Sequence, residues 1–134
     1  MANLAAIQEL VNGPRNLVLK LDIEGDGSGE IVNGALVEVG ALNCTEVRLD
    51  RVQGTVDGFD INLTWDGTTT APLFNIPGSK DSRISEDWTK TGGLINPKVA
   101  NYTGDVSMNT TGLESGEKAS LQFHFVKKHY EAPR

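Results

Sequence analysis

Three acidic residues in the first quarter of the chain have the spacing of a cation-binding loop. Asp22, Glu24 and Asp26 occupy alternate positions. Gly27 follows them, as in the first half of an EF-hand loop, where carboxylate oxygens surround Ca²⁺. The twelfth position of that loop is Asn33 and not the usual bidentate Glu. The same residues therefore also fit a solvent-facing strand that runs into a glycine turn, and we expect no bound metal.

The other residues capable of chemistry do not form a recognised catalytic or metal-binding pattern. His124 and His129 are five positions apart and would not share one face of a strand. Cys44 has no metal-ligand partner near it, whereas a zinc or iron site needs three or four converging ligands. Ser85 and Ser107 lie outside any Gly-x-Ser-x-Gly motif. The sequence therefore predicts a protein that is not an enzyme and that holds no cofactor.

The two tryptophans have different expected roles. Trp65 ends a series of apolar residues at alternate positions that begins at Phe59, which indicates a place in the core. Trp88 lies in a stretch without regular pattern, where it is either a pin that holds a loop to the core or an exposed anchor for a partner. An exposed Trp88 on a β-sandwich would also be able to stack on a sugar.

The elements that must position these residues are short strands. Residues 17–24 alternate apolar and polar side chains, as a half-buried strand does. Residues 47–65 predict a hairpin, because Asp57 and Gly58 suit a two-residue type I′ turn. The apolar phase changes near Asp50, which predicts a β-bulge.

The second half of the chain predicts one more hairpin and one long connection. In the hairpin, residues 102–109 pair with residues 118–127. Residues 78–101 are punctuated by proline and glycine and exceed the length of an ordinary hairpin loop. They are expected to form a projecting loop with contacts to a partner, or a crossover between two sheets.

The predicted organisation is a single domain with short extensions. Residues 1–14 predict an N-terminal arm or short helix of about two turns, which would need docking to be stable. Residues 15–128 predict a β-sandwich domain that includes the long loop, and residues 129–134 predict a flexible tail. About eight short strands with frequent turn signals indicate an all-β fold, namely an antiparallel β-sandwich of jelly-roll or Greek-key type.

The charge balance excludes several classes of partner. The 134 residues include 12 Lys and Arg and 18 Asp and Glu, for a net charge of −6. Nucleic acids and anionic membranes are bound largely through Lys and Arg, so we expect neither as a partner. The single cysteine cannot form an intrachain disulfide. The first residues lack the cationic start and apolar run of a signal peptide, so we expect synthesis in a cytoplasm.

Two segments of this small, acidic, cysteine-poor chain resemble the capsid cement proteins, also called decoration proteins, of tailed bacteriophages. They are VDGFDINLTWDG (Val56–Gly67) and TGDVSMNTTGLESGEKASLQFHFVKK (Thr103–Lys128). The resemblance implies a jelly roll or related β-sandwich, a homodimer or homotrimer, and clamping of neighbouring subunits of the major capsid protein. It also implies a virion protein that is made in the cytoplasm of the bacterial host, and it brings no catalytic residues.

For this function we expect the partner contacts to be apolar residues of the arm and the long loop. They are Leu4, Ile7, Trp88, Leu94 and Ile95. Two alternatives stay open. One is a carbohydrate-binding β-sandwich module, with Ca²⁺ at the three acidic residues as an optional aid. The other is a structural protein of the phage tail or of the head–tail connector.

Overall fold

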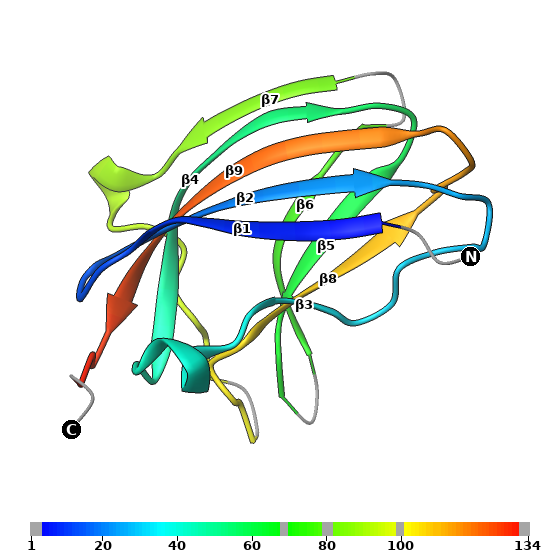
Figure 1. Ribbon diagram of the computed structural model, residues 1–134. Helices are drawn as coiled ribbons and strands as arrows, with labels where there is room; N and C mark the ends of the chain where they lie inside the picture. The colour runs from blue at the N-terminus through cyan, green and yellow to red at the C-terminus, as the bar shows by residue number, and fades with distance from the viewer. Residues whose placement is uncertain (1–3, 68–69, 79–81, 99–100, 132–134) are drawn as a thin grey trace.

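Two antiparallel β-sheets packed face to face make up the computed structural model (Figure 1). The structure describes all residues except 1–3, 68–69, 79–81, 99–100 and 132–134. Its strands are β1 (Leu4–Asn12), β2 (Asn16–Glu24), β3 (Gly34–Val37), β4 (Glu46–Val56), β5 (Asp60–Trp65), β6 (Ala71–Ile76), β7 (Ser82–Asp87), β8 (Val106–Thr111) and β9 (Lys118–Lys128). Two short 3₁₀ helices are η1 (Val39–Leu42) and η2 (Thr89–Thr91). The predicted all-β sandwich is confirmed.

The strands pair in a nested order that defines a jelly roll. β2 pairs with β9, β3 with β8, β4 with β7 and β5 with β6, all antiparallel. β9 also pairs with β4, and β8 with β5, so the sheets run β1-β2-β9-β4-β7 and β3-β8-β5-β6. Successive strands alternate between the sheets from β2 to β5 and again from β6 to β9. The result is an eight-stranded jelly roll to which β1 is added at one edge.

Both predicted hairpins are wrong, because each divides its two strands between the sheets. β4 and β5 are joined at Asp57 and Gly58, but β4 belongs to the five-stranded sheet and β5 to the four-stranded sheet. β8 and β9 are separated in the same way. Asp57 donates its N–H to the Lys118 carbonyl at 2.9 Å, and Gly58 donates to the Gly78 carbonyl at 2.8 Å. These residues therefore make a crossing between the sheets and not a tight turn within one.

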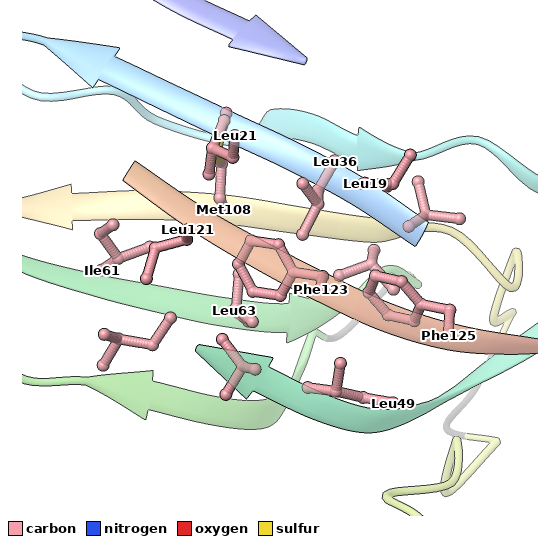
Figure 2. Packing of buried hydrophobic residues seen from close by; sticks show 14 of the residues in the cluster. Leu19, Leu21, Leu36, Leu49, Ile61, Leu63, Met108, Leu121, Phe123 and Phe125 are labelled. Carbon is pink, nitrogen blue, oxygen red and sulfur yellow. The ribbon is translucent and has the colours of Figure 1, made fainter. Parts of the chain in front are cut away.

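The side chains predicted to face inward are nonetheless buried. Phe59, Ile61, Leu63 and Trp65 are at most 2% exposed. Figure 2 shows the side chains of β9 between the sheets, where the rings of Phe123 and Phe125 stack with centroids 6.1 Å apart. The predicted bulge near Asp50 is confirmed, since the pairing of β4 with β9 shifts between Leu49 and Arg51. The shift restores the apolar phase of β4 on the core side.

The N-terminal residues form a strand, so the predicted short helix is wrong. β1 pairs antiparallel with β2 along the edge of the five-stranded sheet, with Ile7 opposite Leu21. A helix of two turns is unstable by itself in water, whereas pairing with β2 satisfies the backbone groups along one side of β1. Residues 1–3 of the predicted arm lie outside the described residues.

Residues 78–101, predicted as one long connection, cross between the sheets and carry a strand. β7 pairs with β4 at the edge of the five-stranded sheet. The strands before and after it, β6 and β8, belong to the four-stranded sheet. Two short stretches of this segment, 79–81 and 99–100, are outside the described residues.

The tail, predicted to be flexible over residues 129–134, is described as far as Glu131. Glu131 donates its backbone N–H to the Asn43 carbonyl at 2.8 Å. The Lys127 ammonium lies 5.1 Å from the centroid of the Tyr130 ring, within range of a cation–π contact. These contacts hold the described part of the tail against the sandwich.

Gly78 lies where two crossings between the sheets meet. Its carbonyl accepts the Gly58 N–H at 2.8 Å, and its own N–H donates to the Asp60 carboxylate at 2.9 Å. A Cβ atom at this position would overlap the Phe59 carbonyl oxygen and the Val56 side chain. The close approach of the two crossings therefore requires glycine here.

We expect Gly78→Ala to lower the free energy of unfolding by about 1–3 kcal/mol, because the overlap forces the backbone to shift. The matched control is Gly40→Ala, where an added Cβ would meet no atom within 4 Å. That variant should stay within about 0.5 kcal/mol of the parent protein. Urea denaturation measures both, and equal stability of the two variants would contradict the proposed crowding.

Candidate functional site

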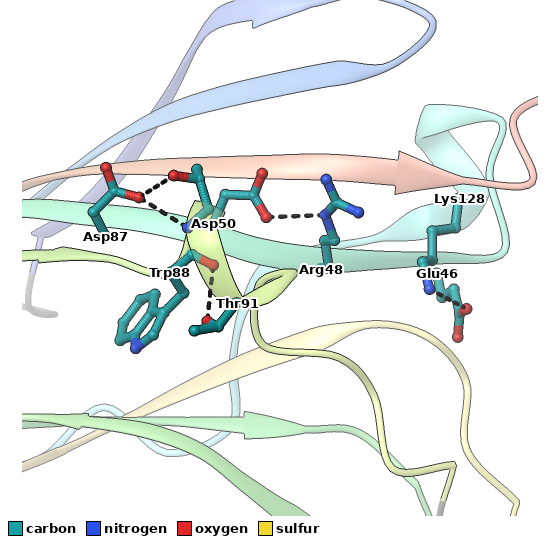
Figure 3. Close-up of polar contacts among 8 residues, drawn as sticks. Glu46, Arg48, Asp50, Asp87, Trp88, Thr91 and Lys128 are labelled. Carbon is teal, nitrogen blue, oxygen red and sulfur yellow. Dashed lines mark hydrogen bonds and ion pairs between the residues drawn. The ribbon is translucent and has the colours of Figure 1, made fainter.

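Trp88 closes one flank of the sandwich. Its half-buried indole packs against the core, edge-on to the ring of Phe74, with centroids 5.0 Å apart and planes at 74°. The backbone N–H of Trp88 donates to the Asp50 carbonyl at 2.8 Å. The Trp88 carbonyl accepts the Gly93 N–H at 2.9 Å and the Thr91 hydroxyl at 3.0 Å (Figure 3). These are the contacts of a pin that holds the segment after β7.

Charged side chains hold the same segment (Figure 3). The Asp87 carboxylate accepts the N–H of Thr89 at 2.9 Å and its hydroxyl at 2.7 Å. These hydrogen bonds lower the pKa of Asp87. Arg51 Nε lies 3.6 Å from the Asp87 carboxylate, and Arg48 Nε donates to Asp50 at 3.0 Å. Arg48 and Arg51 are therefore each paired with an aspartate within the chain.

The other two predicted contacts in this segment differ in exposure. Leu94 and Leu49 exchange two backbone hydrogen bonds of 2.8 and 3.0 Å, and the Leu94 side chain packs against the core. Ile95, the next residue, is 59% exposed. Leu94 therefore anchors the segment, whereas Ile95 presents an apolar side chain to solvent.

The remaining predicted contacts, Leu4 and Ile7, lie on β1 at the opposite flank. The backbone of Leu4 pairs with Glu24, and its side chain is outside the described part of the structure. Ile7 is 39% exposed and faces the same side of the sheet as its buried neighbour Leu21. The five predicted contact residues are thus divided between two flanks and do not form one surface.

A groove of about 260 Å³ runs under β1, where the five-stranded sheet has one strand beyond β2. It is lined by Ile7, Glu9, Leu19, Ala35, Leu36, Val37, Glu38, Ala41 and Leu42. Most of these side chains are apolar, and two are carboxylates. The sequence did not predict this groove, because it exists only if β1 is a strand paired with β2.

The three acidic residues of the predicted cation loop are not brought together. Asp22 forms an ion pair with Lys20 at 3.1 Å, and Asp26 accepts the Ser28 N–H at 2.9 Å in the turn after β2. Asp22 and Glu24 share a face of β2, but such positions are about 6.6 Å apart along a strand. Among the described residues, no three His, Cys, Asp or Glu side chains are grouped to hold a metal ion.

Glu30, which the sequence did not single out, anchors the segment that follows this turn. Its carboxylate accepts the Gly112 N–H at 2.6 Å, the Leu113 N–H at 2.9 Å and the Thr110 hydroxyl at 2.9 Å. The hydrogen bond from Leu113 is the largest cause of a lowered pKa of Glu30. Two of these partners are 82 and 83 positions away, so no local spacing could have identified the residue.

His124 and Cys44 have environments that do not favour activation. The His124 ring lies on the outer face of the five-stranded sheet, with Nε2 3.2 Å from the amide nitrogen of Gln122. Burial, helped by the charge of Arg51, lowers the pKa of His124. Burial raises the pKa of the Cys44 thiol, which disfavours the thiolate needed for nucleophilic attack.

A polar hollow of about 450 Å³ lies on the outer face of the five-stranded sheet. Lys20, Gln122, Gln53 and Ser85 lie side by side across four strands at this place. The amide groups of Gln53 and Gln122 are 3.4 Å apart. The hollow offers amide and hydroxyl groups for hydrogen bonding, and none of its described lining residues is aromatic.

No protein-family model matches this sequence, and a search of curated proteins found no match. In the part of the chain that the structure describes, no helix is both long enough and apolar enough to cross a lipid bilayer.

We expect Trp88→Ala to lower the free energy of unfolding by about 2 kcal/mol, because it leaves a space against Phe74 at a half-buried site. Ile95→Ala, at an exposed apolar residue of the same segment, is the control and should change stability by less than about 0.5 kcal/mol. Chemical denaturation of both variants measures the difference. An unchanged stability of Trp88→Ala would show that the indole is not a pin.

We expect Glu30→Gln to be less stable than the parent protein at neutral pH. A carboxyl group whose pKa is lowered by folding contributes stability above its unfolded pKa, and that stability is lost as the pH falls through its folded pKa. The difference in melting temperature should therefore shrink in acid, as Glu30 of the parent protein becomes protonated. Thermal unfolding across pH measures this, with Glu86→Gln, at an exposed residue of β7, as control. A difference that does not vary with pH would rule out this role.

Proposed function

We propose that this protein is a non-enzymatic structural component of a bacteriophage virion that binds the assembled capsid lattice and stabilises it. The observation that carries the proposal is the jelly-roll topology, with four strand pairs nested around one core. Viral capsid domains share this architecture with lectin domains and cupins. The resemblance of residues 56–67 and 103–128 to capsid cement proteins favours a virion protein within that set.

A well-filled interior supports a role in adhesion more than one in catalysis. Trp65, Phe59 and Phe123 are at most 2% exposed between the sheets. The groups that remain available to a partner are on the outer faces of the sheets, at the two flanks and in the turns. Such a molecule presents its surface, and not an internal pocket, to whatever it binds.

The net charge of −6 supports a place on the outside of the shell, away from packaged nucleic acid, because like charges repel. The partner in this proposal is the major capsid protein. A homodimer or homotrimer of this chain would contact several capsid subunits at once, which strengthens binding without new contacts. The protein is made in the cytoplasm of the bacterial host and then resides in the virion.

Stabilisation of the shell follows from mass action. A protein that binds the assembled lattice and not the free subunit makes each occupied site harder to take apart. At a free concentration one hundred times the dissociation constant, this amounts to about 2.7 kcal/mol for each site. Many occupied sites on one shell therefore add up to a large resistance to heat.

We expect the purified protein to co-sediment with assembled capsids of the phage that encodes it, because its binding surface matches the lattice. It should stay in the supernatant with unassembled major capsid protein. Capsids that carry it should release their DNA at a higher temperature than capsids without it, and electron microscopy should place its density on the shell.

Three results would contradict this function. Density on the tail or connector would favour the tail or head–tail connector alternative. Binding to a glycan array that is lost in Gln53→Ala, in the polar hollow, would favour the carbohydrate-binding alternative. Failure to bind capsids at any concentration, in a protein that remains folded, would exclude capsid cementing altogether.

A further inference from the structure

The four edges of the two sheets differ in how they are protected from further strand pairing. The edge strand β6 contains Pro72, which cannot donate to a neighbouring strand. The edge strand β3 has only four residues. The edge strand β7 carries Arg83, Glu86 and Asp87 among its six residues. Proline, short length and charge are the usual devices that prevent pairing at a sheet edge.

β1 has little of this protection. It has nine residues, contains no proline or lysine, and carries one charged side chain, Glu9. Among the described residues, no strand pairs with its outer edge. Its irregularity is a shift in pairing between Glu9 and Val11, which leaves a regular stretch from Leu4 to Glu9. The exposed side chains of Leu10 and Val11, at 44% and 46%, extend the apolar character of the strand.

The groove under β1 adds side-chain recognition to this open backbone. Ile7 lies opposite Leu21 and Glu9 lies opposite Leu19, so both point to the core side of the five-stranded sheet. β1 lies at the edge of that sheet, and Ile7 remains 39% exposed. An added strand beside β1 would therefore place alternate side chains over this groove.

The charges of the groove indicate the chemistry of its occupant. Glu9 and Glu38 line it together with seven apolar residues, and none of the lining residues is basic. The Glu9 carboxylate accepts a hydrogen bond from the Asn12 amide at 2.9 Å, which leaves its charge uncompensated. Within the part of the chain that the structure describes, neither glutamate has a Lys or Arg within ion-pair distance. A complementary segment carries apolar side chains and cationic groups together.

A second copy of β1 does not satisfy this requirement. Its one charged residue is again Glu9, so a second β1 strand would add another carboxylate to this edge and no cation. Like charges placed close together across strands are destabilising. The charge pattern thus favours a different protein as the occupant over a homodimer formed through β1.

We infer that the outer edge of β1 and the groove beneath it bind an extended segment of the partner protein, rich in apolar residues and in Lys or Arg, by β-strand addition. Backbone hydrogen bonds to β1 supply part of the affinity, and apolar side chains in the groove supply specificity. Lys or Arg of the segment pairs with Glu9 and Glu38. Under the proposed function, on which this choice of partner rests, the segment belongs to the major capsid protein.

The test uses the full-length protein and two synthetic peptides, one with the repeat Val-Thr-Lys-Thr (the Val–Lys peptide) and the other with the repeat Val-Thr-Glu-Thr (the Val–Glu peptide). In both repeats Val and the charged residue lie on the same face of an extended strand. Amide chemical shifts of the labelled protein should change along β1 and at Leu36 and Leu42 when the Val–Lys peptide is added. The Val–Glu peptide should cause no such change. Equal binding of both peptides, shifts confined to another face, or no binding of either would overturn the inference.

Two variants with the same new side chain test the groove itself. Glu9→Lys should weaken binding of the Val–Lys peptide roughly tenfold, because it turns an attraction into a repulsion. Gln8→Lys is the control, since Gln8 lies opposite Lys20 and faces the outer side of the sheet. The affinity of Gln8→Lys for the Val–Lys peptide should change less than threefold, because an exposed charge on the outer side of the sheet contributes little. An equal loss in both variants would contradict the role of the groove.

Capsid binding separates this inference from the proposed function. If the parent protein binds capsids and Glu9→Lys binds them equally well, the inference about β1 fails and the proposed function stands. If the parent protein does not bind capsids but the Val–Lys peptide binds at β1, the proposed function fails and the strand-addition site stands. Dimerisation of the free protein that protects the β1 amides from solvent exchange would overturn the inference in favour of a second copy.

Discussion

Pairing of β9 with both β2 and β4 is the interaction on which the sandwich depends. It places Phe125 opposite Leu17 on one side, and Leu121 opposite Gly54 on the other. These partners are far apart in the chain, so their loops must close before the contacts can form, and such topologies fold slowly. Without β9, the inward faces of β2 and β4 have no common neighbour. The last strand of the chain therefore completes the core.

Polar groups at the turns support this long-range pairing. Glu30 ties the segment after β2 to the turn after β8, and the Trp88 backbone ties the segment after β7 to Asp50 of β4. Each of these contacts joins segments distant in sequence and satisfies backbone groups at a crossing. Arg48 and Arg51 of β4 are also paired with aspartates at the β7 flank. The β1 flank, in contrast, keeps uncompensated carboxylates beside apolar side chains.

Alternation in the sequence predicted the burial of Phe59 and the bulge at Asp50, because both depend only on which side of a strand meets the core. It did not predict the neighbours of a strand. A tight turn at Asp57 and Gly58 is locally favoured, but the Gly58 N–H bonds to the carbonyl of Gly78. The helix expected at the N-terminus reflects the spacing of Leu4, Ile7 and Val11, which would place them on one helical face, but in the structure these residues form a strand paired with β2. Glu30 and the groove depend on contacts between distant segments, so local pattern could not predict them.

The two edges of the five-stranded sheet differ in their ability to pair with a further strand. One flank is plugged by Trp88 and Phe74 and bordered by charged β7, whereas the other ends in the unprotected strand β1. A protein that can accept an added strand at a single sheet edge binds one such partner at a time. It cannot link one partner to another through its sheets. Strand addition at β1 therefore takes up one occupant for each copy of the chain, and this contact does not propagate into fibres.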